Sequence, residues 1–355
     1  MKTPYYLLLS MAFVFFFGSS LIAKNANSLF DLLSKQEVLE LKIVTSLDRL
    51  TDNDLNRKYQ PAKALFEIGN KSFEMDLKVK SRGRFRRRIC DFPPLKLNFD
   101  KDELEELGLL KFDKLKLVTH CMDEKFISKE NVIREFLAYQ LYQDISAYSL
   151  RVQLVEVTYV DELKPSNKVK RWGFLIEDID ELAARVGAVE LDTFGLGQAQ
   201  MDGLAWEKMT VFQYMIGNTD WDIRMARNVK ILQIKKSGAL IPVPYDFDFA
   251  GLVNAPYAVP NPDFQIASVK DRVYQGEDQN NAHLGQTLFF FKQHREKLLQ
   301  RVEDLPELSR DTRYEVSTFL NSFFDQDINR VNELSARENK VMRVPASEVL
   351  QTRGN

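Results

Sequence analysis

Residues 212–251 constrain the fold more than any other part of the chain. They read as the end of an apolar helix, a polar loop, a strand, a turn at Ser237-Gly238 and a second strand that runs into Tyr245-Asp246. Two strands joined in this way bring their outer ends close together. We therefore expect the polar side chains on the two sides of the hairpin to meet, namely Asn218, Asp220, Asp222 and Asn228 with Asp246 and Asp248.

Several carboxylates at one point repel each other unless a cation or a substrate neutralises them. Carboxylate and amide oxygens suit a hard ion such as Mg2+ or Mn2+. This ligand set is the one that phosphoryl transfer requires, so it predicts an enzyme centre. A metal-dependent phosphohydrolase or nuclease could use the same carboxylates. Against that alternative, the histidines lie outside the acidic stretch, at His120, His283 and His294, and no hydrolase motif occurs.

The first 23 residues predict a secretory signal peptide. One positive charge at Lys2 precedes an apolar core and small residues that end at Ala23, after which we expect cleavage. The alternative is an uncleaved membrane anchor, because the apolar run approaches the roughly 20 residues of a spanning helix. We thus expect an exported, periplasmic or extracellular protein. In such a chain Cys90 and Cys121 form either one disulfide or two buried thiols.

The order of the expected elements predicts an α+β fold, with a mainly antiparallel sheet and a helical lobe behind it. Residues 24–177 are expected to be rich in strands and residues 178–341 in helices, with a frayed tail at 342–355. A hairpin is expected across Gly69-Asn70, and a long loop at residues 254–285. Strands are expected at 41–47, 60–68, 71–80, 95–99, 115–119, 152–160 and 170–177, and helices at 28–41, 128–143, 204–216, 287–302, 310–322 and 325–334. The net charge of -2 gives no attraction to nucleic acid, so no nucleic-acid partner is expected.

The basic run at residues 82–88 is expected to be a loop between two strands. Such runs are either solvated or bind a polyanion, and Gly83 would let backbone amides approach a phosphate. On the next expected strand, Lys96 lies on the face opposite Leu95 and Leu97. This lysine is either solvated on an edge strand or buried with a phosphate and a carboxylate, and its spacing alone favours the solvated position.

With these parts in place, residues 78–251 resemble the spore-coat protein H (CotH) family of secreted, atypical protein kinases. The order and spacing of several short motifs carry the resemblance. They are Lys80-Ser81-Arg82-Gly83, Pro94-Leu95-Lys96-Leu97-Asn98-Phe99, Val132-Ile133-Arg134-Glu135-Phe136-Leu137-Ala138-Tyr139, Gly173-Phe174-Leu175-Ile176-Glu177-Asp178-Ile179-Asp180, Asn218-Thr219-Asp220, Arg227-Asn228 and Pro244-Tyr245-Asp246.

The resemblance implies a two-lobed, kinase-like fold that uses ATP with Mg2+ or Mn2+ and phosphorylates Ser or Thr of a secreted or cell-envelope protein. It makes Asp220 the residue that orients or deprotonates the accepting hydroxyl. Lys96 would contact the α- and β-phosphates, with Glu135 as its ion-pair partner. Asn228 and Asp246 would be the metal ligands, with Asp222 and Asp248 as nearby alternatives. Arg82 and Gly83 would contact the nucleotide.

The chain also departs from the family pattern. The loop after Arg82-Gly83 is usually small and polar, whereas here it is Arg84-Phe85-Arg86-Arg87-Arg88. Its charge suits either an acidic substrate or stronger phosphate binding, and the alternatives are a solvated loop or a degenerate pocket. No Gly-x-Gly loop precedes Lys96, and no His-Arg-Asp triplet precedes Asp220. A catalytically inactive scaffold with a kinase fold is therefore the alternative.

Overall fold

The structure is a computed structural model that describes residues 27–52, 57–276 and 282–325. The expected signal peptide at 1–23 and the tail at 342–355 lie outside the described residues, as does nearly all of the helix expected at 325–334. Within the described part, none of the helices combines the length and the apolar character that a membrane crossing requires.

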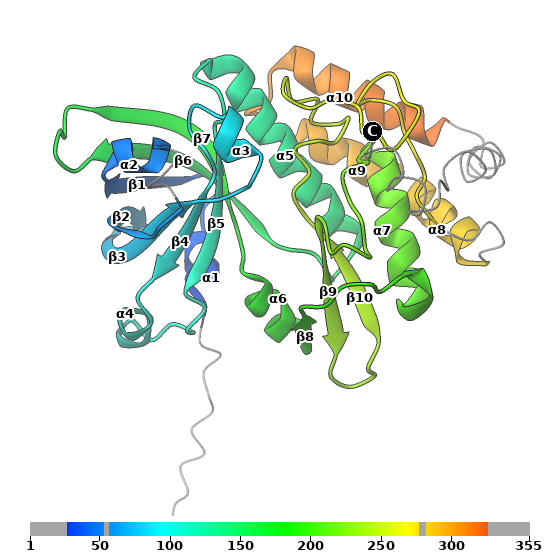
Figure 1. The fold of residues 1–355 in the computed structure, drawn as a ribbon, viewed down its shortest axis with the longest axis horizontal. Helices are drawn as coiled ribbons and strands as arrows, with labels where there is room; N and C mark the ends of the chain where they lie inside the picture. The colour runs from blue at the N-terminus through cyan, green and yellow to red at the C-terminus, as the bar shows by residue number, and fades with distance from the viewer. Residues whose placement is uncertain (1–26, 53–56, 277–281, 326–355) are drawn as a thin grey trace, which may run out of the picture.

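The amino-terminal half forms a closed barrel, at the left of Figure 1. Its strands follow the order β1-β2-β3-β4-β5-β7-β6, and a parallel pairing of β1 with β6 closes it, while all other neighbours are antiparallel. The strands are β1 (Leu39–Thr45), β2 (Gln60–Ile68), β3 (Lys71–Ser81), β4 (Leu95–Phe99), β5 (Lys114–Thr119), β6 (Val152–Asp161) and β7 (Lys168–Ile176).

The α+β class and the predicted strands are confirmed, whereas the closure of the barrel was not predicted. Alternation is a local signal, and Met75, Leu77 and Val79 of β3 point into the barrel core as their spacing indicates. The β2–β3 hairpin turns at Gly69, whose φ of 59° favours glycine. Closure depends on a parallel pairing between strands that lie far apart in the chain, for which a single sequence has no local pattern.

The helices differ from the expected ones mainly at their ends. The helix at residue 28 has the predicted Ser28 cap but ends at Leu33 and not at residue 41, and β1 begins at Leu39. The long helix α5 begins at Lys125, capped by Glu124, and not at Ser128. Part of the basic run, expected to be a loop, is the short helix α3. The helical elements are α1 (Leu29–Leu33), α2 (Leu47–Thr51), α3 (Arg86–Ile89), α4 (Lys101–Glu106), α5 (Lys125–Ile145), α6 (Ile179–Arg185), η1 (Gln198–Gln200), α7 (Gly203–Met215), α8 (Ala282–Gln293), α9 (Arg295–Glu303) and α10 (Arg310–Phe324).

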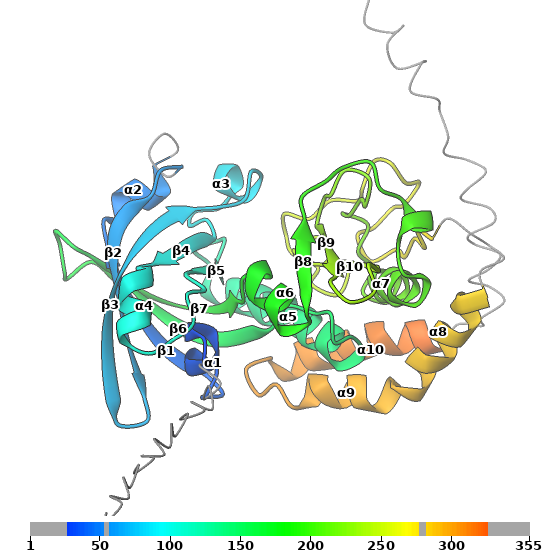
Figure 2. The same ribbon diagram turned by 90° about the horizontal axis from the view of Figure 1, so that it is seen from below.

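Helix α5 lies between the barrel and the rest of the molecule (Figure 1). It contacts β7 of the barrel and α9 on its other side, and it is buried around most of its circumference. Beyond it, β8 (Ala188–Leu191), β9 (Val229–Ile234) and β10 (Leu240–Pro244) form a second sheet in the order β10-β9-β8. Figure 2 shows this sheet and α7 above a layer of α8, α9 and α10.

Two glycines hold the loop after α7 against the segment after β10. Gly217 has a φ of 65°, and its carbonyl accepts a hydrogen bond of 3.0 Å from the amide of Gly251. A Cβ at Gly251 would lie 2.6 Å from the carbonyl oxygen of Val269, so only glycine fits this close approach. The contact brings together the two segments that carry Asp220 and Asp246.

Candidate active site

The ends of the β9–β10 hairpin meet as the sequence predicts. The amide of Tyr245 donates to the carbonyl of Asn228 over 3.0 Å, directly beyond the paired residues Val229 and Pro244. This places Asn228 beside Asp246 at the wall of a cavity of about 250 Å3. The cavity is lined by residues that follow β3, precede β9 and follow β10, namely Arg82, Gly83, Arg84, Phe85, Arg86, Pro94, Asp220, Arg227, Asn228, Asp246, Asp248 and Phe249.

A larger cavity of about 860 Å3 lies against the outside of β1 and β2. Its lining mixes acidic, basic and apolar side chains and contains none of the predicted site residues. Perturbed, converging titratable groups identify a functional site better than volume does. We therefore take the smaller cavity as the candidate active site.

Asn228 and Asp246 are held in an uncommon backbone conformation. Their φ angles are 54° and 63°, in the left-handed region that residues other than glycine seldom adopt. Such strain persists where the surrounding structure enforces it, and it concentrates at functional sites. Here Asn228 donates through its side-chain amide to the carboxylate of Asp220 over 3.0 Å, and the amide of Asp246 donates to the hydroxyl of Tyr139 over 2.8 Å.

Asp220 faces the cavity with a third of its side chain exposed, 33%. Burial raises the pKa of its carboxyl above the usual value, and Asp248 and Asp246 act in the same direction. Arg227, 3.6 Å away, and the amide of Asn228 oppose this rise. Asp222, the nearby alternative, is not among the residues that line the cavity, and its backbone pairs with that of Arg227.

Arg86 occupies the centre of the acidic cluster. Its guanidinium lies 3.1 Å from both carboxylate oxygens of Glu135, 2.7 Å from Asp248 and 3.4 Å from Asp246. Only 6% of Arg86 is exposed. Although burial would raise the pKa of Asp246, Arg86, Arg82 and Lys116 together hold it below the usual value. The sequence pattern does not distinguish Arg86 from the other arginines of the basic run, which is predicted to be a loop throughout.

The expected ion pair between Glu135 and Lys96 is wrong, because Glu135 bonds to Arg86 instead. Burial raises the pKa of Glu135 to about 8 despite this bond. Glu135 lies on α5 one turn before Tyr139, so one face of this helix positions both Arg86 and the backbone of Asp246.

Lys96 lies on β4 between two other lysines, opposite Lys80 of β3 and Lys116 of β5. Neither Lys96 nor Lys116 is among the residues that line the candidate site. The ammonium of Lys116 lies 4.8 Å from the centre of the ring of Tyr245, the residue before Asp246. Burial lowers the pKa of Lys116 to about 8, Arg82 adds to this effect, and Asp178 and Asp246 oppose it. The sequence feature that could have pointed to Lys116 is its position on β5, the strand directly before α5.

A disulfide between Cys90 and Cys121 ties α3 to the connection between β5 and α5. The sequence did not decide between a disulfide and two buried thiols, and the structure contains the disulfide. The amide of Asp91 also donates to the carbonyl of Cys121 over 2.8 Å. Because Cys90 follows Arg86 by one helical turn, a bond that turns Cys90 inward also turns Arg86 inward.

The donor set suits a hard divalent cation only in part. Glu135, Asp246 and Asp248 each offer an oxygen within 4.8 Å of the others. Arg86 contacts both oxygens of Glu135 and one of Asp248, so these oxygens already have a hydrogen-bond donor and part of their charge is offset. Asp246 keeps 29% of its side chain exposed beside the cavity, and it fits such an ion together with Asn228.

No known family model and no curated protein matches the chain. Among solved structures, it is similar to the crystal structure of a Helicobacter pylori proinflammatory kinase, CtkA. The two are 11% identical, the match covers 69% of this chain and 94% of that chain, and the TM-score is 0.38. Such a score establishes neither a shared fold nor a shared function, so the site is interpreted from its own residues.

Proposed function

We propose that the chain is an exported, atypical protein kinase that depends on Mg2+ or Mn2+. It transfers the γ-phosphoryl group of ATP to Ser or Thr of a secreted or cell-envelope protein. One observation carries the proposal: Asp220, Asn228 and Asp246 line one cavity at the ends of the β9–β10 hairpin, and Glu135 of α5 is linked to this group through Arg86. A lysine on a strand, a glutamate on the following helix, then Asp, Asn and Asp are the parts that kinases use.

Each residue then has a role that follows from its position. Asp220 is exposed to the cavity and takes the proton of the accepting hydroxyl, and the raised pKa of its carboxyl makes it a better base than an ordinary aspartate. The hydroxyl oxygen forms a bond to the γ-phosphorus as the bond from that phosphorus to the ADP oxygen breaks. Asn228 and Asp246 hold the cation, which neutralises phosphate charge when bound. Arg82 and the backbone of Gly83 face the phosphates from the loop after β3.

The lysine that contacts the α- and β-phosphates is Lys116 in this proposal, and Lys96 is the less suitable position. Lys116 lies on the strand that directly precedes α5, and it stands over Tyr245, next to Asp246. In kinases the lysine strand is likewise followed by the helix that carries the glutamate. A buried ammonium with a lowered pKa also gains stability when an anion pairs with it.

Arg86 favours a second candidate, the catalytically inactive scaffold. A guanidinium that contacts three carboxylates supplies the neutralisation that a cation would otherwise supply. In the enzyme, Arg86 holds Glu135 and Asp248 while Asp246 and Asn228 take the cation. In the scaffold, Arg86 replaces the cation and no nucleotide binds.

A thermal-shift measurement on the purified chain separates the two candidates. ATP is added with Mg2+ or Mn2+ to the wild type, to Asp246→Asn and to the control Asp222→Asn, which removes a neighbouring charge outside the cavity. At about 100 times its Kd, a ligand stabilises the folded state by roughly 2.7 kcal/mol. The enzyme predicts a cation-dependent shift in the wild type and in Asp222→Asn that Asp246→Asn loses. A folded wild type with no shift supports the scaffold. Transfer of labelled γ-phosphate to a protein then tests catalysis itself.

A further inference from the structure

The arginines of the loop after β3 divide into two groups with different surroundings. Arg86 points inward. Among the described residues, every ion pair formed by this loop and α3 involves Arg86. Arg84 and Arg88 are exposed, and Arg87 is half-buried. The three outer side chains form a positive surface with no ion pair to a carboxylate among the residues that the structure describes. We call this surface the outer arginine cluster: Arg84, Arg87 and Arg88.

The members of this cluster lie close enough to repel one another. Burial lowers the pKa of Arg87, and the charges of Arg57, Arg88 and Arg84 lower it further. Arg87 stays in place because it donates to the carbonyl of Gly83 over 3.0 Å. Like charges held together without a counter-ion raise the free energy of the unbound protein, and an anionic ligand relieves this.

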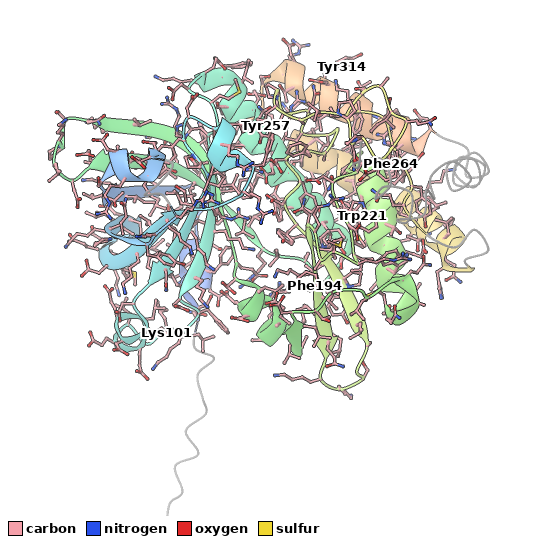
Figure 3. The ribbon with its side chains drawn as sticks, in the orientation of Figure 1. Lys101, Phe194, Trp221, Tyr257, Phe264 and Tyr314 are labelled. Carbon is pink, nitrogen blue, oxygen red and sulfur yellow. A yellow bond between two sulfur atoms is a disulfide. The ribbon has the colours of Figure 1, made fainter. Side chains whose placement is uncertain are left out.

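The cluster borders the candidate active site. Arg84 itself lines the cavity that Asp220 faces, and Arg227 lines the same cavity with 45% of its side chain exposed. Beside the arginines, Phe85 is 45% exposed and packs edge-on against Phe249 with ring centres 5.3 Å apart. Tyr257 completes this aromatic group and lies next to α3 in Figure 3. A chain segment that presents a hydroxyl to Asp220 would therefore have its neighbouring residues beside arginines and an aromatic surface.

We propose that the outer arginine cluster selects substrates by binding acidic residues close to the accepting Ser or Thr. Arginine suits this task because its planar guanidinium pairs with a carboxylate through two hydrogen bonds. The inference rests on the proposed function for the position of the hydroxyl. Its charge argument depends only on the surface, so binding tests it separately from catalysis.

The test measures fluorescence anisotropy of labelled peptides, without nucleotide, at low and at physiological salt. The peptides share a central Ser flanked by Glu, by Ala or by Lys. The proteins are the wild type, Arg84→Glu/Arg88→Glu and the matched control Lys235→Glu/Lys236→Glu. The control makes the same change in charge at exposed lysines in the β9–β10 turn, at the opposite end of that hairpin from Asp246.

We expect the Glu peptide to bind the wild type at least about tenfold more tightly than the Ala or Lys peptide. Arg84→Glu/Arg88→Glu should lose this preference, the control should keep it, and salt should weaken it. Equal binding of all peptides overturns the inference, and so does an equal loss in both double variants. Single-stranded DNA that binds as tightly, with the same loss in Arg84→Glu/Arg88→Glu, also overturns it by showing general polyanion binding.

Two further readouts separate this inference from the proposed function. If Arg84→Glu/Arg88→Glu loses the ATP thermal shift and the peptides show no preference, the outer arginines bind nucleotide phosphates and the inference is wrong. If the Glu peptide binds selectively but ATP gives no shift in the wild type, the acidic-peptide surface stands and the kinase proposal fails.

Discussion

Replacing Arg86 by Met tests whether its guanidinium is the internal counter-ion of the acidic cluster. Met keeps much of the side-chain volume and removes only the charge and its hydrogen bonds. In the wild type one guanidinium contacts Glu135, Asp246 and Asp248, and the side chain of Arg86 is only 7% exposed. The variant leaves these carboxylates together with no cation between them.

Removing one partner of a buried ion pair costs about 3–5 kcal/mol, because the remaining charge stays buried and unpaired. Three contacts place Arg86→Met at the upper end of this range. Burial raises the pKa of Glu135 to about 8 even beside Arg86, and removal of the guanidinium raises it further, so Glu135 stays protonated in the variant and adds little repulsion. We therefore expect the free energy of unfolding to fall by roughly 3–4 kcal/mol.

Urea unfolding at pH 7.5, followed by tryptophan fluorescence, measures this loss with and without Mg2+ or Mn2+. A cation that enters the space left by the guanidinium should restore up to about 2.7 kcal/mol at 100 times its Kd, while it stabilises the wild type less. The control is Arg87→Met, which removes an arginine from the outer side of the same helix and leaves the carboxylates paired. If Arg86→Met is as stable as Arg87→Met, or if the cation stabilises both equally, the assignment of Arg86 as counter-ion is refuted.

Three further predictions follow from neighbouring residues. Lys116→Met should abolish the ATP-induced thermal shift while Lys96→Met keeps it, and the opposite result would return the phosphate contact to Lys96. The free energy of unfolding of Cys90→Ser/Cys121→Ser in urea should fall by about 3–4 kcal/mol, since the disulfide closes a loop of 31 residues. Amide hydrogen exchange of residues 82–94 should also become faster in this variant. Unchanged exchange would show that α3 is held by other contacts. Burial lowers the pKa of His120 to about 3, below its unfolded value of 6.5, so this residue stabilises the fold above pH 6.5 and the contribution is lost as pH falls towards 3. Between pH 7 and pH 5 the wild type should lose about 2 kcal/mol more than His120→Gln, and equal losses would contradict the assignment.

The parts of the fold that sequence could predict are those with a local signal. The β2–β3 hairpin follows from alternation and from Gly69, and its bounds agree with the prediction to within a residue. The convergence of Asn228 and Asp246 also follows from a short hairpin with a clear turn. By contrast, the parallel closure of β1 on β6 joins strands more than a hundred residues apart, and neither strand carries a mark of its partner.

The same distinction explains why the sequence could not place the partner of Glu135. Lys96 and Lys116 lie opposite each other on paired strands, and both alternate with leucines, so pattern alone cannot decide between them. Our proposal favours Lys116 on chain order, because Lys116 is on the strand that leads into α5 and Glu135 is on α5. The resemblance assigns the phosphate contact to Lys96 from its sequence motif and does not take chain order into account.

Arg86 belongs to a run of basic residues but lies inside the protein, next to a disulfide-bonded cysteine. Basic runs are usually solvated, and by composition Arg84, Arg86 and Arg88 are equivalent. The disulfide at Cys90 breaks the equivalence, since it fixes one side of α3 against the connection that leads into α5. Arg86, one turn before Cys90, contacts Glu135, whereas Arg84 and Arg88 are exposed. The inner arginine thereby controls the charge of the candidate active site, while the outer ones remain available to a ligand.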